Sequence, residues 1–290
     1  MGILQSTSTQ TDYVASMWLV LIAYFILKYV NSGFLIYIFG FAFSLGIGIL
    51  TKGSTYIFAL PFCIWIGWYV IMKNRKHFMY LFIVPLIILI CNLGHFSRNI
   101  NLFGNPLGFG NERVSSKVTN SVININTLTS NLIRNIGLNL STPIKKINIF
   151  TAQTITSSLN FLNISTNDPA TTWIPRYGYY IPFSFYESSA PNTFHFIIIL
   201  FVIFLMICNK KLLYNEKYYT FSIIAGFILF SLLLKWTAVH NRLLLNLFVL
   251  CSPIVSLLLF KYQFNRLTHI LAIGLLLYSA PYVLFNKTRP

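Results

Sequence analysis

The chain has very few acidic residues and little charge of either sign. Only five of its 290 residues are Asp or Glu, against 21 Lys and Arg, and charged residues make up 9% of the total. Hydrophobic residues make up 56%, and the mean hydropathy is +0.69. Soluble domains usually contain about 25% charged residues. This composition excludes an ordinary soluble protein.

Cysteine is also scarce. Cys63, Cys91, Cys208 and Cys251 all lie inside apolar segments, and no two of them have the spacing of a metal-binding pair. We expect packing residues here, and neither disulfides nor metal ligands.

Long apolar segments dominate the rest of the chain. Most are 17 or 18 residues long, near the lower limit for an α-helix that crosses a hydrocarbon core of about 30 Å. A backbone in lipid must satisfy its own hydrogen bonds, which favours helices. The sequence predicts an all-α polytopic membrane protein with about eight transmembrane helices, at 14–30, 34–51, 55–72, 78–94, 194–208, 219–235, 243–260 and 267–284.

One polar segment interrupts the apolar ones. It divides the chain into a four-helix part at 1–94, a loop at 95–193 and a second four-helix part at 194–290. Apolar residues at a spacing of four predict a surface helix near 128–140, and Thr142-Pro143 predicts the start of another. The stretch 168–183, with its prolines and aromatic residues, is typical of irregular structure.

The distribution of the basic residues predicts the orientation. One set of short loops holds nine Lys and Arg, the opposite loops and ends hold five, and the long loop holds seven. The positive-inside rule therefore places the KNRKH turn (73–77) in the cytoplasm and the long loop and both termini outside. An outward N-terminus without a signal peptide predicts that an odd number of spans precedes Met1. The basic residues form no stripe, so the +16 charge does not indicate nucleic acid.

Charged residues are missing from the middle of the spans. An ion-coupled transporter usually has such a group near the bilayer midplane, so this absence disfavours one. Asp12 and Lys52 lie instead at predicted outer span ends. Asp12 fits either a helix N-cap or a reactive carboxylate. Lys52, in LTKGS, fits either a snorkelling lysine or a ligand of a lipid phosphate.

Further polar residues lie at the same predicted membrane level. They occur in GHFSRNINLFGNPLG (94–108), YESSAPNTFHF (186–196) and KWTAVHNR (235–242), and they are Arg98, Glu187, Asn192, His195, His240 and Arg242. Sugar transfer from a polyprenyl phosphate needs such a set. Cations hold the leaving phosphate, and a carboxylate takes the proton of the acceptor. The transition state is oxocarbenium-like, by analogy with glycoside hydrolysis.

In this order, STQTDYVASMWLVLIAYF, GIGILTKGSTYIFALP, GHFSRNINLFGNPL, YESSAPNTFHF and HNRLLLNLFVL resemble the GT-C class of membrane glycosyltransferases. The nearest resemblance is to bacterial relatives of protein O-mannosyltransferases and aminoarabinose transferases. The resemblance implies a GT-C-like fold and an inverting transfer from a polyprenyl-phosphate sugar on the periplasmic face of the inner membrane. The acceptor would be a lipid, a glycan or a protein.

The resemblance also implies residue roles. Asp12 matches the second outer acidic position, and Lys52 matches the lysine near the lipid phosphate. Candidate catalytic residues are thus Asp12 and Glu187, and Asn192 and His195 are further outer-face candidates. The candidate phosphate-binding residues are Lys52, Arg98, His240 and Arg242.

One part of the family pattern is missing. The principal catalytic Asp of the family follows its first span, in a region that this chain does not contain, so we expect the chain to be a piece of a larger enzyme. No cofactor or metal site is indicated, although a divalent cation between Asp12 and Glu187 stays open. Two alternatives also stay open, an O-antigen ligase or polymerase and a non-enzymatic transporter or flippase fragment.

Overall fold

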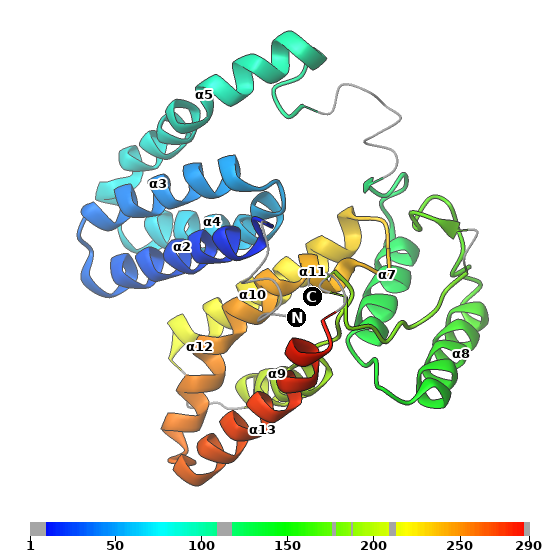
Figure 1. Cartoon of the computed structure of the whole chain (residues 1–290). Coiled ribbons are helices and arrows are strands. Elements are labelled where there is room, and N and C mark those ends of the chain that lie inside the picture. Colours follow the sequence, from blue (N-terminus) through cyan, green and yellow to red (C-terminus); the bar gives the residue numbers. More distant parts are fainter. Residues whose placement is uncertain (1–9, 109–117, 176–177, 187, 209–212, 287–290) are drawn as a thin grey trace. The chain divides into compact units, whose positions relative to one another are not determined.

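The computed structural model describes residues 10–108, 118–175, 178–186, 188–208 and 213–286. The described residues are mainly helical, and they form no named strand, only two isolated β-bridges, Thr119–Leu234 and Thr172–Trp236. The elements are shown in Figure 1. They are α2 (Asp12–Ser32), α3 (Ile36–Thr51), α4 (Ser54–Lys73), the 3-10 helix η1 (Arg75–Phe82), α5 (Ile83–Phe103), α7 (Ile125–Leu138), α8 (Lys145–Phe161), α9 (Thr193–Cys208), α10 (Tyr214–Leu233), α11 (His240–Leu243), α12 (Leu245–Lys261) and α13 (Asn265–Leu284).

Each predicted span coincides largely with an apolar helix. Five helical segments are long and apolar enough to cross a membrane, and they are Asp12–Ser32, Ser54–Lys73, Arg75–Phe103, Tyr214–Leu233 and Arg266–Leu284. The helices α3, α9 and α12 are shorter, at 16, 16 and 17 residues. The all-helical, membrane-integral prediction is confirmed to this extent. That all eight helices span the membrane stays a prediction.

One predicted span is shorter than the helical segment that contains it. The sequence predicted a helix at 78–94, but Arg75–Phe82 is a 3-10 helix and α5 continues to Phe103. The helix ends there because Gly104 adopts φ +69, and its N–H bonds to Ile100 O. This left-handed conformation suits glycine. Arg98 is therefore on a helix and not at the start of a loop.

Packing divides the chain into two compact units. The N-terminal unit contains Thr11–Ser115 and Met206–Leu229, and the C-terminal unit contains the described parts of Ser116–Leu205 and Phe230–Pro290. This division follows contacts between helices, whereas the three predicted parts follow the expected membrane boundaries. Those boundaries stay a prediction.

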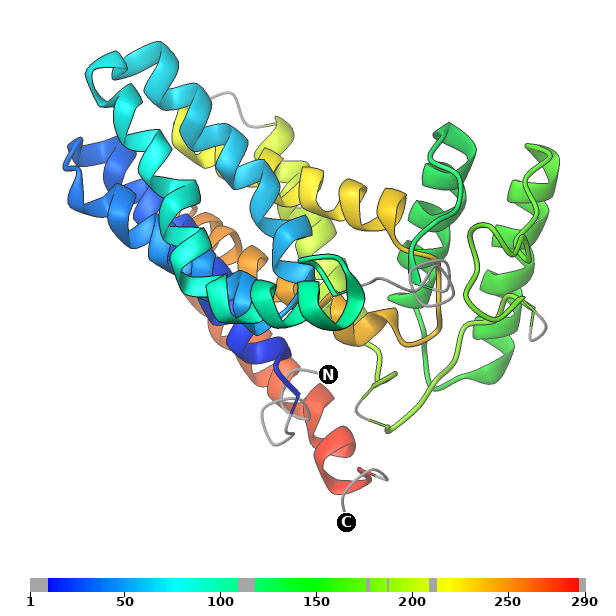
Figure 2. The same cartoon turned by 90° about the horizontal axis from the view of Figure 1, so that it is seen from above.

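In the N-terminal unit, α2 packs on α3 and α4, and α3 packs on α5 (Figures 1 and 2). The packing face of α2 repeats at intervals of four and three residues, as in helix bundles. Its members are fully buried at Ala15, Leu19, Ile22 and Ile26. Opposite faces of the unit carry exposed Leu, Ile and Phe side chains, which suits contact with lipid.

Close approach of α3 to its neighbours depends on glycine. A Cβ on Gly46 would lie 3.1 Å from Cys91 Cβ of α5, and a Cβ on Gly48 would lie 2.9 Å from Thr55 Cγ2. Asn92 of α5 also donates to Gly46 O at 2.9 Å. Small residues at these positions let the helix backbones meet, as is typical of membrane helices.

In the C-terminal unit, α7 packs on α8 and α11, and α12 packs on α11 and α13. The two predicted surface helices are present as α7 and α8. The second begins at Lys145 rather than at Thr142-Pro143. The Asn148 side chain accepts from Thr142 N and donates to Thr142 O, both at 2.8 Å, and so holds Thr142 in a turn before the helix. The prediction of irregular structure at 168–183 is confirmed for its described residues.

Candidate functional site

Asp12 and Lys52 meet at one end of the N-terminal unit. Asp12 is the first residue of α2, and Lys52 directly follows α3. Lys52 Nζ forms an ion pair with Asp12 Oδ1. The Asp12 side chain is fully buried and the Lys52 side chain is 18% exposed. A carboxylate and its cation are thus held together in a site with little access to water.

The geometry corrects one of the earlier alternatives for Asp12. The N-cap of α2 is Thr11, so the N-cap role for Asp12 is wrong by one residue. Asp12 still lies in the first turn, where the helix dipole favours negative charge. The Lys52 ammonium pairs with the buried Asp12 carboxylate, and the choice between a snorkelling lysine and a phosphate ligand stays a prediction.

A tight turn brings the pair next to the start of a third helix. Gly53 separates Lys52 from Ser54, the first residue of α4, and Thr55 N bonds to Lys52 O at 3.0 Å. Thr55 is fully buried. Ser16, one turn into α2, donates to Asp12 O at 2.8 Å. The ends of α2, α3 and α4 therefore surround the ion pair.

Arg98 lies toward the same end of this unit. The hydrogen bond from Asn92 to Gly46 shows which residues of α3 and α5 lie side by side. Lys52 comes six residues after Gly46, and Arg98 comes six residues after Asn92. Six residues advance about 9 Å along a helix. Arg98 is exposed, and its Nη2 lies 3.4 Å from His95 Nδ1. Among the described residues it contacts this ring and not the Asp12–Lys52 pair.

His240 is in the C-terminal unit and is deeply buried. Its Nδ1 lies 2.9 Å from Asn135 Oδ1, and its ring centroid lies 4.8 Å from that of Phe230. Burial, with a further contribution from the positive charge of Arg134, lowers the His240 pKa from 6.5 to about 3. The ring is therefore neutral near pH 7. It provides a hydrogen bond within the unit and no positive charge for a phosphate.

Arg134 on α7 was not among the predicted site residues, yet it has the largest fully buried side chain. It donates to Thr166 O at 2.6 Å, to Thr172 Oγ1 at 2.7 Å and to Asn131 Oδ1 at 2.6 Å. Its guanidinium lies 5.4 Å from the Trp236 ring centroid. Burial lowers its pKa from 12.5 to about 10, so it stays charged. Arg134 ties the segment 166–172 to α7.

The polar face of α7 also completes the end of α10. Asn131 Nδ2 donates to the carbonyls of Ser231 and Leu234, each at 3.0 Å, and Asn120 Nδ2 donates to Leu232 O at 2.7 Å. The last carbonyls of a helix have no partner within the helix. These asparagines supply the partners and so fix the segment that leads into α11.

The other predicted residues of the C-terminal unit lie around α9 and α11. Asn192 directly precedes α9 and is 9% exposed, and the His195 ring lies 5.4 Å from that of Phe248. Arg242 is half-buried on α11. Asn241 Nδ2 donates to Ser189 O at 3.4 Å, which links α11 to the segment before α9. Glu187 lies outside the described residues.

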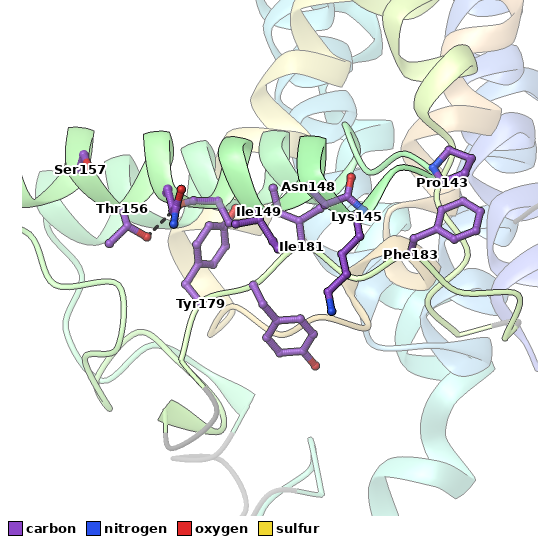
Figure 3. Close-up of a pocket in the computed structure, with 12 residues that line it drawn as sticks. Pro143, Lys145, Asn148, Ile149, Thr156, Ser157, Tyr179, Ile181 and Phe183 are labelled. Carbon is purple, nitrogen blue, oxygen red and sulfur yellow. Dashed lines mark hydrogen bonds between the residues drawn. The ribbon is translucent and has the colours of Figure 1, made fainter.

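A groove of about 680 Å³ lies between one face of α8 and the segment 179–183 (Figure 3). Hydroxyl and amide groups of α8 face tyrosine and phenylalanine rings across it. Its lining residues are Pro143, Lys145, Asn148, Ile149, Ala152, Gln153, Thr156, Ser157, Tyr179, Tyr180, Ile181 and Phe183. None of them is a carboxylate or a histidine, so the groove offers binding groups and no general base.

Within the described part of the chain, no group of three or more His, Cys, Asp or Glu side chains could hold a metal ion. No protein-family model, no curated protein and no solved structure matches the chain. Its function has to be inferred from its own residues and their geometry.

Proposed function

We propose that this chain is part of a glycosyltransferase that moves a sugar from a polyprenyl-phosphate donor to an acceptor on the outer face of the membrane. The observation that carries the proposal is the buried Asp12–Lys52 pair at the ends of α2, α3 and α4. A carboxylate beside a lysine at a membrane-helix end supplies both a proton acceptor and a ligand for phosphate. The GT-C resemblance of the sequence supports the same chemistry.

Lys52 is the proposed ligand of the donor phosphate. An ammonium group has three N–H donors, and one of them serves Asp12. The leaving group of the transfer is a phosphate that departs with the electron pair of its bond to the sugar. It needs positive charge and no proton donor, and Lys52, with Arg98 toward the same end of the unit, would supply that charge.

Asp12 is the proposed general base. Its carboxylate would accept the proton of the acceptor hydroxyl as the new glycosidic bond forms and the bond from the sugar to the phosphate breaks. Asp12 is fully buried, so an acceptor reaches it only when Lys52 turns away. The donor phosphate competes with Asp12 for Lys52. Asp12 would therefore become accessible to the acceptor only when the donor, with its sugar, is bound to Lys52.

The C-terminal unit would contribute fewer groups than the sequence predicted. Arg242 is half-buried and cationic, and it remains a candidate for the phosphate. Neutral, buried His240 is left out of this role, because it provides a hydrogen bond to Asn135. The outer-face role of Asn192, His195 and Glu187 stays a prediction.

Binding of a polyprenyl monophosphate, measured with the purified chain in detergent, tests the proposal. Lys52→Gln and Asp12→Asn both break the ion pair, but only the first removes the cation. We expect Lys52→Gln to weaken binding at least tenfold and Asp12→Asn to leave it unchanged or tighter. Equal losses in both variants would mean that the pair only holds the helices together, and undiminished binding by Lys52→Gln would remove Lys52 from the donor site.

A further inference from the structure

A second polar site lies at the other end of the N-terminal unit. The turn after α2 and the turn after α4 enclose a hollow of about 780 Å³. Its lining is Ser32, Gly33, Phe34, Leu35, Lys73, Asn74, Arg75, Lys76 and His77. The hollow belongs to the end opposite the Asp12–Lys52 pair, because α2 begins at Asp12 and ends at Ser32.

The charge of this hollow is entirely positive. Lys73, Arg75 and Lys76 are exposed, and none of them forms an ion pair within the described part of the chain. Arg75 Nε donates to Ile71 O at 3.0 Å, which holds its side chain against the end of α4. Three neighbouring cations without a carboxylate repel one another and favour an anion between them.

Two residues that line the hollow, Asn74 and His77, are hydrogen-bonded to α2. Tyr29 of α2 is fully buried, and its hydroxyl lies 2.9 Å from His77 Nδ1. Asn74 Nδ2 donates to the Tyr29 hydroxyl at 3.1 Å and lies 3.1 Å from His77 Nδ1. These contacts hold the turn that carries the cations against α2. The site is therefore preorganised, which lowers the entropic cost of binding.

Exposed apolar side chains lie on the same two turns and on the helix that follows the cations. The 3-10 helix η1 begins at Arg75 and has no buried residue. Met79 is 70% exposed, Phe82 61% and Phe34, on the opposite turn, 64%. A soluble anion gains no binding energy from contact with such apolar side chains, whereas the acyl chains of a lipid bury apolar surface against them. Charge and exposed apolar surface in one place indicate a ligand with both a phosphate and an acyl chain.

We propose that this hollow binds the phosphate headgroup of an anionic phospholipid, with Lys73, Arg75 and Lys76 as its ligands and Phe34, Met79 and Phe82 against the acyl chains. Basic pockets between membrane helices on the cytoplasmic side are suited to such headgroups. The predicted orientation of the KNRKH turn places this site in the cytoplasmic leaflet. The inference is independent of the transferase proposal, because it uses none of its residues.

Native mass spectrometry of the full chain tests this, with phosphatidylglycerol and phosphatidylcholine added in detergent. Lys73→Gln with Lys76→Gln removes two charges from the hollow. The matched control, Lys261→Gln with Arg266→Gln, removes two exposed charges from another loop on the same predicted side. We expect about 30-fold weaker phosphatidylglycerol binding in the first variant, from the usual contribution of two basic residues. The control should bind like the unmodified chain.

Three outcomes would overturn the proposal. Equal losses in both double variants would show a general charge effect, and no loss in the first would show that the hollow is not the site. Displacement of phosphatidylglycerol by millimolar inorganic phosphate would show a site for free phosphate instead. Asn74→Ala keeps every charge but removes the contacts of Asn74 with Tyr29 and His77. This variant is expected to bind phosphatidylglycerol severalfold more weakly.

Discussion

Lys52 and Asp12, forty residues apart in the chain, form an ion pair between the end of α3 and the beginning of α2. The pair is asymmetric, because Asp12 is fully buried and Lys52 is 18% exposed. Loss of the lysine would leave a buried carboxylate without its cation, whereas loss of the carboxylate would leave a lysine that still reaches water. Because of this asymmetry, substitution of Lys52 and substitution of Asp12 should differ in their effect on the stability of the chain as well as on the proposed chemistry.

A double-mutant cycle on this pair should show the asymmetry. We expect Lys52→Gln to lower the free energy of unfolding by about 3 kcal/mol, since breaking a buried pair from one side is costly. Asp12→Asn should cost less, and the double variant should resemble Asp12→Asn. Denaturant unfolding in detergent measures all three. Additive effects of the two single changes would contradict a direct interaction.

Arg134 should be the residue of segment 118–190 that is most sensitive to substitution. Arg134→Met would leave Asn131 Oδ1 without its donor and would remove one of two donors from the carbonyls of Thr166 and Thr171. Hydrogen bonds from a charged group contribute roughly 1.5–3 kcal/mol each, so we expect a loss of at least 3 kcal/mol. Arg134→Lys should lower the stability by a similar amount, because lysine lacks the planar guanidinium group with its several N–H donors.

Limited proteolysis of 118–190 and thermal unfolding measure the Arg134 effect. Lys146→Gln, on the exposed start of α8, is the control for loss of one positive charge. A stable Arg134→Met variant with unchanged proteolysis would contradict the assignment of Arg134 as the residue that ties segment 166–172 to α7.

His240 should make stability depend on acid. Its pKa is about 3 in the folded chain, well below the ordinary value of about 6.5 that the unfolded chain would have. A depressed histidine pKa contributes stability that is present above pH 6.5 and is lost as the pH falls toward 3, because only the unfolded chain takes up the proton. The loss should be about 1.4 kcal/mol per pH unit.

The difference between the unmodified chain and His240→Gln isolates this effect, since glutamine keeps a hydrogen-bond donor but does not titrate. Between pH 6.5 and pH 4.5 the unmodified chain should lose more stability than the variant. Parallel curves would mean that His240 is accessible to protons in the folded state.

Gly46 should be required for the packing of α3 on α5. A Cβ there would lie 3.1 Å from Cys91 Cβ and 3.5 Å from Ile88 Cα, so Gly46→Ala should destabilise the chain by about 1–3 kcal/mol. Gly94→Ala is the control on α5, because its Cβ would meet nothing within 4 Å. Alanine there should be neutral or stabilising. Equal behaviour of the two variants would contradict the close approach of these helices.

Most helices could be predicted from the sequence, because apolar residues recur over lengths that lipid requires. The end of α5 could not, since His95, Arg98 and Asn99 look like loop residues until the glycine that stops the helix is identified. The pairing of Asp12 with Lys52 was also beyond prediction. Both residues were selected for their position at span ends, but their contact depends on how α2 packs against α3.

The interior of segment 118–190 was the least predictable part. Leu128, Leu132, Ile136 and Leu140 predicted the helix, yet these residues are only half-buried. The deeply buried face of α7 instead carries Asn131, Arg134 and Asn135. An apolar pattern cannot indicate a polar interior whose partners are distant carbonyls. The spacing Asn-x-x-Arg-Asn at 131–135 was the available signal, and the burial of His240 beside Asn135 could not be predicted for the same reason.

Sugar transfer itself is the most direct test of the central claim. Membranes with the chain, a labelled polyprenyl-phosphate sugar and endogenous acceptors would be compared for the unmodified protein and Asp12→Asn, with donor binding measured in parallel. The account predicts that Asp12→Asn binds the donor at least as tightly as the unmodified chain but transfers less than a hundredth as fast, as expected for loss of a general base. Equal transfer by both proteins would contradict it.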